Sequence, residues 1–527
     1  MRDSRWTPLD VTIPVATETK PGCVLSSVSW ILTSRGPMTV RDALINAHDV
    51  EGLDPLLNGI QTGALLRFLT AVASLVLRGQ GNAAGAFDAA AVDAALSGLY
   101  AHSDLFDRDR PFLQVPAGAE PPEKGVRNPV KKLLPWMPAD RAEDFWSENL
   151  QATELDMAGA ALALAVHHHY SFGGNNRLDG RACVNGSPGI RYPGVGYTAT
   201  EVLWHGRNLF ETLLMNTPKV WVDGTGLPAW ADPDCVLSQQ GAGRPEHPLW
   251  RATWGSNTAK CRWEGDRLTA VSTGGSPYRP PTMGAGKLAA KAWWDLRNTE
   301  DDFYLYVDVE TKVGGIVTGS ARKAQRLDLG HNETDLAVEW NAKNLSTAMR
   351  RRSRGTVKPP ARSARVMFLR HLVEGSASSP VVRRTEVLIS SPKKWMVDVD
   401  RADAVSDASL LMQAVCAELC KPFTPNGRLS ALQDRRVDVE SSFWQLVSKP
   451  FEDFIINGTG DFIDPSVWAV VRASSLAAFD QVTESAPMAK LAPFIMAARS
   501  GVSQNTSKVL KAALSGASRA YQSIGGG

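Results

Sequence analysis

The sequence has 527 residues, of which 43% are hydrophobic and 21% are charged, as in globular proteins with a substantial core. A chain of this length typically forms roughly two to four domains. The formal net charge of +2 excludes a protein that is strongly basic or acidic throughout, so a nucleic-acid site would have to be a local patch.

The six cysteines contain no CxxC pair, which argues against a zinc ribbon or a redox motif. Cys416 and Cys420 share one face of a predicted helix, and we interpret them as small core residues rather than as a ligand pair. The opening segment, MRDSRWTPLDVTIPVA, has no continuous apolar core and predicts no signal peptide. Residues 63–77 are apolar but broken by Arg67, and the run is too short to span a bilayer. We therefore expect a cytoplasmic protein without membrane contact.

The N-terminal elements are predicted from apolar spacing and from helix end signals. Residues 53–79 predict a helix, with Asp54 as its N-cap and Gly79 as its end. Residues 89–102 predict a second helix, and residues 104–116 a loop followed by a short strand.

The next segments centre on a run of three histidines. Residues 151–170 predict a helix that ends in this run and leads into a glycine turn. The segment that follows is dense in glycine, proline and asparagine, which predicts irregular structure. Residues 201–216 predict a further helix. From about residue 221 to 400, short strands over residues 303–310, 364–373 and 385–390 alternate with loops.

The chain changes character after about residue 400, where four segments with helical apolar spacing follow one another. No strand–helix–strand period is visible before that point. The sequence therefore predicts an α+β fold, with a large mixed α/β domain over residues 1–400 and a C-terminal four-helix bundle over residues 401–527. The four helical segments are residues 409–423, 439–454, 465–482 and 507–523.

Common catalytic motifs are missing from the sequence. GxSxG, HExxH and the paired deaminase motif do not occur. TMGAGKLAAK lacks the first glycine of a phosphate loop and has Leu288 where a magnesium-binding hydroxyl should stand. GVGYTA, from Gly194, follows a proline-rich loop rather than a strand. We therefore expect no catalytic residues and no cofactor.

The histidines at positions 167 to 169 are the first candidate for a site. Consecutive residues of a helix point about 100° apart, so these rings do not converge on one metal ion. We interpret His167, His168 and His169 as a helix C-terminus, where histidine interacts favourably with the helix dipole. Gly173 and Gly174 would then let the backbone approach a partner closely. The alternative is a metal-dependent hydrolase or nuclease that uses the histidines with a carboxylate such as Asp179.

The strongest charge feature is residues 350–365, with seven basic residues and no acidic one. Gly355 and the following proline pair predict a loop. We interpret this segment, and Arg350, Arg351 and Arg352 in particular, as a phosphate-contacting patch, the alternative being a solvated loop on a pure scaffold protein.

Several segments in a fixed order resemble the CasA family, the large subunit of the type I-E CRISPR surveillance complex Cascade. They are DLFDRDRPFLQVP, KKLLPWMPADRAEDFW, the helix ending HHHYSFGGNN, GYTATEVLWHGRNLFETLLMN, PLWRATW and SPYRPP. The likeness is strongest over residues 40–285. It implies a non-catalytic subunit that recognises the protospacer-adjacent motif (PAM) on double-stranded DNA, helps to open the duplex and docks the CRISPR helicase–nuclease. The implied partners are the guide CRISPR RNA, the target DNA and the other Cascade subunits.

Two loops of the family have counterparts in this sequence. A loop that inserts toward the 5′ end of the guide RNA corresponds to residues 145–156 and begins with Phe145, Trp146 and Ser147. Of the family pattern Phe-Val-Asn, this chain keeps the phenylalanine. Without the resemblance, the two aromatic residues fit either a buried anchor or a base-stacking contact. The glycine loop that contacts the PAM in the minor groove corresponds to Ser171, Phe172, Gly173, Gly174 and Asn175.

Two further elements are implied by the resemblance. A hairpin with a polar wedge corresponds to residues 374–382, where Ser378 and Ser379 replace the usual glutamine. The motif-contacting lysine of the family lies before SPYRPP, where Lys260, Arg262 and Arg267 are candidates, and we select Arg262. Cys261 stands alone where some members have a cysteine cluster, so we expect no zinc.

Overall fold

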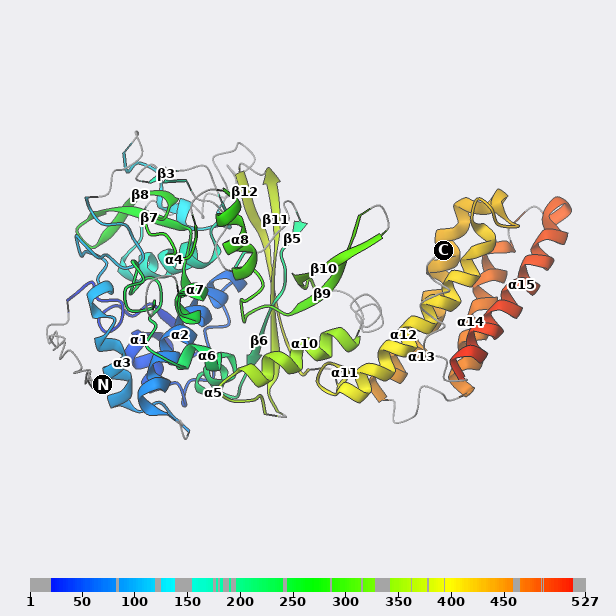
Figure 1. Cartoon of the computed structure of the whole chain (residues 1–527), viewed down its shortest axis with the longest axis horizontal. Coiled ribbons are helices and arrows are strands. Elements are labelled where there is room, and N and C mark those ends of the chain that lie inside the picture. Colours follow the sequence, from blue (N-terminus) through cyan, green and yellow to red (C-terminus); the bar gives the residue numbers. More distant parts are fainter. Residues whose placement is uncertain are drawn as a thin grey trace, which may run out of the picture. The chain divides into compact units, whose positions relative to one another are not determined.

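The computed structural model divides into two compact units, which are described separately (Figure 1). The first unit comprises residues 1–326 and 352–391, and the second comprises residues 327–351 and 392–527. The predicted boundary at residue 400 falls inside helix α12 (Val399–Cys420). The structure describes residues 20–81, 85–118, 125–137, 154–173, 177–178, 181–182, 189–190, 196–239, 244–284, 287–313, 316–327, 342–361, 363–376, 379–392, 394–457, 465–484, 486 and 488–514.

Helix α2 (Gly59–Gln80) is the central element of the first unit. Its N-cap is Asn58, which forms a capping box with Gln61, and not the predicted Asp54. The Asp54 carboxylate instead accepts from the Leu56 amide in the preceding turn. Among the described residues, α2 is the one helix long and apolar enough to cross a membrane, but almost all of it is buried inside the unit.

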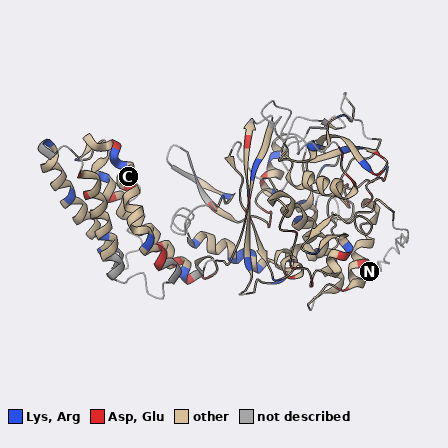
Figure 2. Ribbon diagram, turned by 180° about the vertical axis from the view of Figure 1, so that it is seen from behind, with Lys and Arg blue, Asp and Glu red and all other residues tan. Residues whose placement is uncertain are grey.

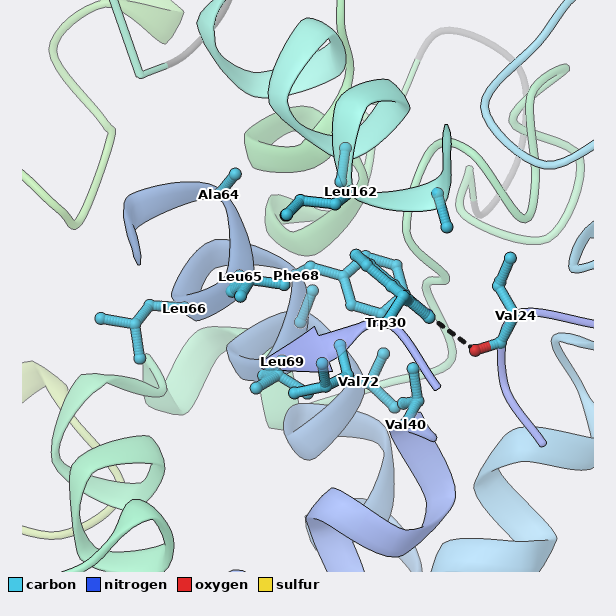
Figure 3. Packing of buried hydrophobic residues seen from close by; sticks show 14 of the residues in the cluster. Val24, Trp30, Val40, Ala64, Leu65, Leu66, Phe68, Leu69, Val72 and Leu162 are labelled. Atoms are coloured by element: carbon cyan, nitrogen blue, oxygen red, sulfur yellow. Dashed lines mark hydrogen bonds between the residues drawn. The ribbon is translucent and has the colours of Figure 1, made fainter. Parts of the chain in front are cut away.

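Aromatic side chains fix α2 within the core (Figure 3). The Trp30 ring stands edge-on to Phe68 at 5.0 Å, and its indole N–H donates to the Val24 carbonyl at 2.8 Å. Phe68 stacks on Trp230 with ring centroids 5.4 Å apart. Burying each such side chain contributes about 1.5 to 3 kcal/mol to the free energy of unfolding. The apolar composition of α2 is therefore explained by its burial in the core.

Helices α3, α4, α5 and α6 of the first unit pack directly against α2. The predicted helix over residues 89–102 is present as α3 followed by a single 3₁₀ turn. The described elements are α1 (Val40–Ile45), α3 (Ala89–Ser97), α4 (Met157–Tyr170), α5 (Leu209–Asn216), α6 (Lys219–Val222), α7 (Pro248–Thr253), α8 (Lys287–Arg297) and the 3₁₀ helices η1 (Tyr100–His102) and η2 (Val130–Leu133).

The main sheet of the first unit is built on the hairpin of β11 (Arg365–Ser376) and β12 (Ser379–Ser390). β5 (Gly196–Tyr197) and β6 (Glu201–His205) pair antiparallel with the other edge of β11. The remaining described strands form separate hairpins. These are β1 (Ile31–Thr33) with β2 (Gly36–Met38), β3 (Arg177–Leu178) with β4 (Arg181–Ala182), β7 (Asn257–Glu264) with β8 (Arg267–Gly275), and β9 (Tyr306–Val313) with β10 (Ile316–Ala324).

The predicted helix over residues 201–216 is wrong in its first half. That half is strand β6, in which Val202 pairs with Phe368 and His205 with Arg365. Helix α5 begins only after Asn208, whose side chain caps it by accepting from the Glu211 amide at 2.9 Å. Pairing with a strand so distant in sequence overrides the local apolar spacing.

The predicted loop over residues 350–365 is also wrong in its first part. Residues 350–355 form the end of helix α10 (Ala342–Gly355). The helix is amphipathic, with Leu345, Ala348 and Met349 buried, and arginine is a good helix former. It ends at Gly355, ahead of the proline pair that cannot continue it.

The second unit contains the C-terminal helical bundle. The described part has four long helices, and α12–α13, α13–α14, α14–α15 and α15–α12 are neighbours in space. Its core includes Phe443, Phe451, Phe479 and the buried Cys416 and Cys420. Together with the mixed first unit, the bundle makes the fold α+β. The helices are α11 (Lys394–Val397), α12 (Val399–Cys420), α13 (Arg436–Asn457), α14 (Pro465–Thr483), α15 (Met488–Leu514) and the 3₁₀ helices η5 (Lys421–Phe423) and η6 (Ser430–Arg435).

Candidate nucleic-acid interface

The last turn of α4 carries the three histidines into the interior of the first unit. Their side chains are buried, and His168 Nε2 lies 2.7 Å from the Thr253 carbonyl oxygen. Burial lowers the pKa of His167 and of His168 to about 4, so both rings are neutral at pH 7. The predicted helix C-terminus is confirmed, but the charged interaction with the helix dipole is not, because neutral rings lack the charge.

A metal centre at the histidines has little support in the geometry. Within the ranges that the structure describes, no group of three histidine, cysteine or acidic side chains is placed to hold a metal ion. Asp179, the carboxylate of the hydrolase or nuclease hypothesis, lies outside the described residues. The rings of His168 and His169 instead pack edge-on to each other, with centroids 4.9 Å apart.

Asn257, the first residue of β7, holds the start of the predicted glycine loop. Its Nδ2 donates to the Phe172 carbonyl oxygen at 2.8 Å and also to the Ser171 hydroxyl. Asn257 and Ser171 are both buried, and Phe172 packs against the apolar core. Gly173 is half-buried, while Gly174 and Asn175 lie outside the described residues. The first residues of the glycine loop, Ser171 and Phe172, are therefore held in place by Asn257.

The turn before Asn257 packs against the last turn of α4. A Cβ atom at Gly255 would lie 3.0 Å from two ring atoms of His168 and 3.2 Å from the His168 carbonyl oxygen. A larger residue at position 255 would push the turn away from the helix. This close packing, together with the hydrogen bond from His168 to Thr253, fixes the position of Asn257 relative to the loop.

Replacing Asn257 with alanine should release the base of the glycine loop. The buried Ser171 hydroxyl and the partly buried Phe172 carbonyl would each lose a donor, which costs about 1 to 3 kcal/mol. We expect faster chymotryptic cleavage after Phe172, measured by mass spectrometry under native conditions, and a lower urea midpoint. The matched control is Asn46→Ala, since the Asn46 amide is exposed and donates to one carbonyl. Equal cleavage rates in the two variants would contradict the bracing role.

A buried ionic cluster lies behind the same end of α4. Arg67 of α2 donates from Nε to Glu201 at 2.8 Å and from Nη1 to Asp301 at 3.1 Å. The Tyr170 hydroxyl, at the end of α4, donates to the other oxygen of Glu201. All four side chains are buried. The cluster therefore ties α2, α4, β6 and the segment before β9 together.

The arginines at the end of α10 divide into two kinds. Figure 2 shows basic residues along the ribbon of α10. Arg350 and Arg351 are exposed, and no acidic side chain in the described part of the chain pairs with them. Arg352 instead donates from Nη2 to the Asn216 side chain at 3.0 Å, with its Nε and Nη1 buried. Burial lowers the pKa of Arg352 to about 10. We therefore correct the prediction for Arg352, whose guanidinium faces the interior rather than a phosphate at the surface.

The three cationic candidates before SPYRPP lie on or near the β7–β8 hairpin. Lys260 Nζ donates to the Ala117 carbonyl at 2.8 Å, and Arg267 Nη1 lies 3.9 Å from Glu154 Oε1. Arg262 is exposed and lies 3.2 Å from Glu264, which is exposed as well. Exposed pairs of this kind are weak, so the contact with Glu264 leaves the Arg262 guanidinium accessible.

The remaining predicted contacts lie at or beyond the edge of the described residues. The hairpin expected over residues 374–382 is the end of the β11–β12 hairpin, where Ser376 pairs with Ser379. Ser378 lies outside the described residues, as do Phe145, Trp146 and Ser147. Reasoning from sequence missed Asn257 and Glu201. The one signal for the ionic cluster was Arg67, a charge inside an otherwise apolar helix.

Comparison with solved structures shows that the fold is that of CRISPR-associated Cse1 and CasA proteins. The Cse1 of Thermobifida fusca matches with a TM-score of 0.56 and 16% identity, covering 93% of this chain and 98% of the other. The Cse1 of Acidimicrobium ferrooxidans matches at 0.53 and 18%, covering 94% and 99%. A chain of a CRISPR RNA-guided surveillance complex matches at 0.58 and 18%, covering 91% and 99%.

The amino-acid sequence also identifies the protein family to which the chain belongs. Residues 25–286 match the model of the CRISPR-associated protein Cse1 family. No curated protein matches the chain. The chain belongs to the Cse1 family, in agreement with the fold and with the CasA resemblance of its motifs.

Proposed function

We propose that this chain is the large, non-catalytic subunit of a type I-E CRISPR RNA-guided surveillance complex. In that complex it reads the PAM on double-stranded DNA, helps to open the duplex and docks the helicase–nuclease. Membership of the Cse1 family and the fold shared with a chain of a surveillance complex support the assignment. The observation that carries PAM reading is the base of the glycine loop, which Asn257 braces at Ser171 and Phe172.

The proposed contacts differ in the part of the nucleic acid that they meet. The glycine loop, residues 171–175, would enter the minor groove, where little side-chain bulk fits and readout is permissive. Residues 145–147 would contact the guide RNA, and Ser378 and Ser379 would wedge the duplex. Arg262 would contact the motif. Arg350 and Arg351 would contact phosphates, which fix the register of the duplex without reading its sequence. Base pairing with the guide would supply the remaining specificity.

The deciding experiment is a gel-shift assay with a complex assembled with and without this chain. The duplexes carry either a matched or a scrambled motif beside the target. We expect tight, motif-dependent binding only when the chain is present, with an affinity that weakens as salt rises because phosphate contacts release counterions. Equal binding with and without the chain would rule out the proposal.

Replacing Gly173 with aspartate should weaken binding of the matched duplex by about 1 to 3 kcal/mol, or roughly 5- to 150-fold. The side chain would occupy the space needed for close approach, and its charge would repel phosphate. The same gel shift measures the effect. Gly118→Asp adds the same charge at an exposed turn with open space around the Cβ and serves as the control. An unchanged affinity for Gly173→Asp would remove the glycine loop from the interface.

A further inference from the structure

The segment that begins with the glycine loop leaves the end of helix α4 and returns to the same place. It leaves at Ser171, directly after the helix, and returns at Gly189, whose backbone N–H donates to the His169 carbonyl oxygen at 2.7 Å. Within the segment, the short strands β3 and β4 pair with each other and contact β8. The position of Gly189 therefore decides where the returning end of segment 171–189 lies.

Gly189 fits against the end of α4 at a point where a larger residue has no room. A Cβ atom at this position would lie 2.6 Å from two atoms of the Tyr170 ring and 2.8 Å from the His169 carbonyl oxygen. The Tyr170 ring is held from the other side, because its hydroxyl donates to Glu201. Gly189 is buried, so its backbone carbonyl needs a hydrogen-bond donor from within the protein.

Tyr304 supplies that donor. Its hydroxyl donates to the Gly189 carbonyl oxygen at 2.8 Å, and its side chain is 3% exposed. The backbone of Tyr304 forms a β-bridge with Glu201, and its ring centre lies 5.7 Å from the Arg67 guanidinium. The buried ionic cluster therefore holds both ends of segment 171–189. Tyr170 lies at the outgoing end, and Tyr304 holds the returning end through Gly189.

The hold on the returning end matters for the kind of contact that the glycine loop is proposed to make. Hydrogen bonds to base edges need the two atoms within about 3 Å, so a small displacement of the loop weakens them. Phosphate contacts do not read sequence, and the residues proposed for them, Arg350 and Arg351, lie on α10. A loose returning end should therefore reduce the discrimination between motifs rather than the sequence-independent affinity.

We propose that Tyr304 is a positioning residue for motif recognition, which acts by holding Gly189 against the end of α4. The inference rests on the proposed function, because the glycine loop is the element that would read the motif. It adds that a side chain on the segment before β9 sets how well the matched motif is distinguished from others. A segment that is already fixed at both ends has less freedom to lose when it binds DNA.

The test is Tyr304→Phe, which removes the hydroxyl and keeps the buried ring. In the gel-shift assay with the assembled complex, we expect affinity for the matched duplex to fall about 2- to 10-fold, as for one lost hydrogen bond. Affinity for the scrambled duplex and the salt dependence should stay unchanged, whereas a merely structural role would weaken both duplexes alike. Tyr100→Phe is the control, since it removes a hydroxyl that hydrogen-bonds Ser26 instead. Equal losses on both duplexes, or no loss on either, would overturn the proposal.

Hydrogen exchange of the free chain separates this proposal from the proposed function. Peptides that contain the Gly189 amide should exchange at least about twofold faster in Tyr304→Phe, while peptides from the core of α2 should not change. Unchanged exchange at Gly189 would overturn the positioning role, whatever the complex does. Motif-dependent binding that Tyr304→Phe leaves intact would reject the role of Tyr304 and keep PAM reading. Binding that is independent of the motif in the unmodified complex would reject PAM reading and the role of Tyr304 in it together.

Discussion

Replacing Arg67 with alanine should lower the free energy of unfolding of the first unit by about 3 to 5 kcal/mol. The side chains of Arg67, Glu201 and Asp301 are all less than a tenth exposed. Without the guanidinium, the Glu201 and Asp301 carboxylates would lose the cation that balances their charge, in a medium that solvates charge poorly. Arg67 also lies 4.3 Å from the centre of the Phe303 ring, so the variant loses packing as well.

Urea unfolding followed by tryptophan fluorescence measures the effect of Arg67→Ala. The control is Arg41→Ala, which breaks the bond between Arg41 Nε and Asp93 at 2.6 Å, where both side chains are more than a third exposed. Exposed pairs contribute about 0 to 1 kcal/mol, so the control should barely shift the unfolding midpoint. Similar losses in the two variants would mean that the buried cluster is not a structural centre of the unit.

The cluster matters to the proposed interface because it contains Tyr170. This residue ends α4 and directly precedes the glycine loop, and its hydroxyl is fixed by Glu201. Gly63 on α2 leaves the room that Tyr170 needs, since a Cβ at that position would overlap the hydroxyl. Arg67→Ala is therefore expected to loosen the end of α4, and the loop with it, in any molecules that remain folded.

Local sequence patterns were sufficient to predict some helices and strands but not others. The helical segments of the bundle are visible in sequence because an amphipathic helix carries its whole signal within one segment. Strand β6 is not visible in the sequence, because its partner β11 lies more than 150 residues away and the apolar residues of the segment itself have helical spacing. The end of α10 was mistaken for a loop because a run of arginines outweighed their high helix propensity.

The candidate interface likewise has features that the sequence predicts and features that it does not. The glycine loop could be proposed from the sequence because three histidines and a glycine pair mark the segment, and its role stays a prediction. Its brace could not, because Asn257 is 85 residues from Phe172 and nothing around it in the sequence marks a buried amide. Arg352 resembles Arg350 and Arg351 in sequence, and only the fold shows that its guanidinium faces inward. Long-range pairing thus decides which polar residues are available to a ligand.

The stability of the first unit should fall as the pH is lowered from about 6.5 to about 4, because buried histidines resist protonation. Burial lowers the pKa of His167 and His168 to about 4 and that of His371 to about 3. Below the unfolded value of 6.5 the unfolded chain binds these protons and the folded chain does not, so acid favours unfolding. Each histidine contributes a slope of about 1.4 kcal/mol per pH unit. Burial raises the pKa of Glu201, and that of Asp302 to about 7, and these two carboxyl groups act in the opposite sense to the buried histidines.

The histidine prediction is tested by urea unfolding at several pH values between 7 and 4.5, with His371→Phe as the comparison variant. His371 is buried and its ring lies edge-on to Tyr170 at 5.7 Å, so phenylalanine keeps the ring contact and removes one titrating group. The variant should show a slope smaller by about 1.4 kcal/mol per pH unit. An unchanged slope would mean that His371 can be protonated inside the fold.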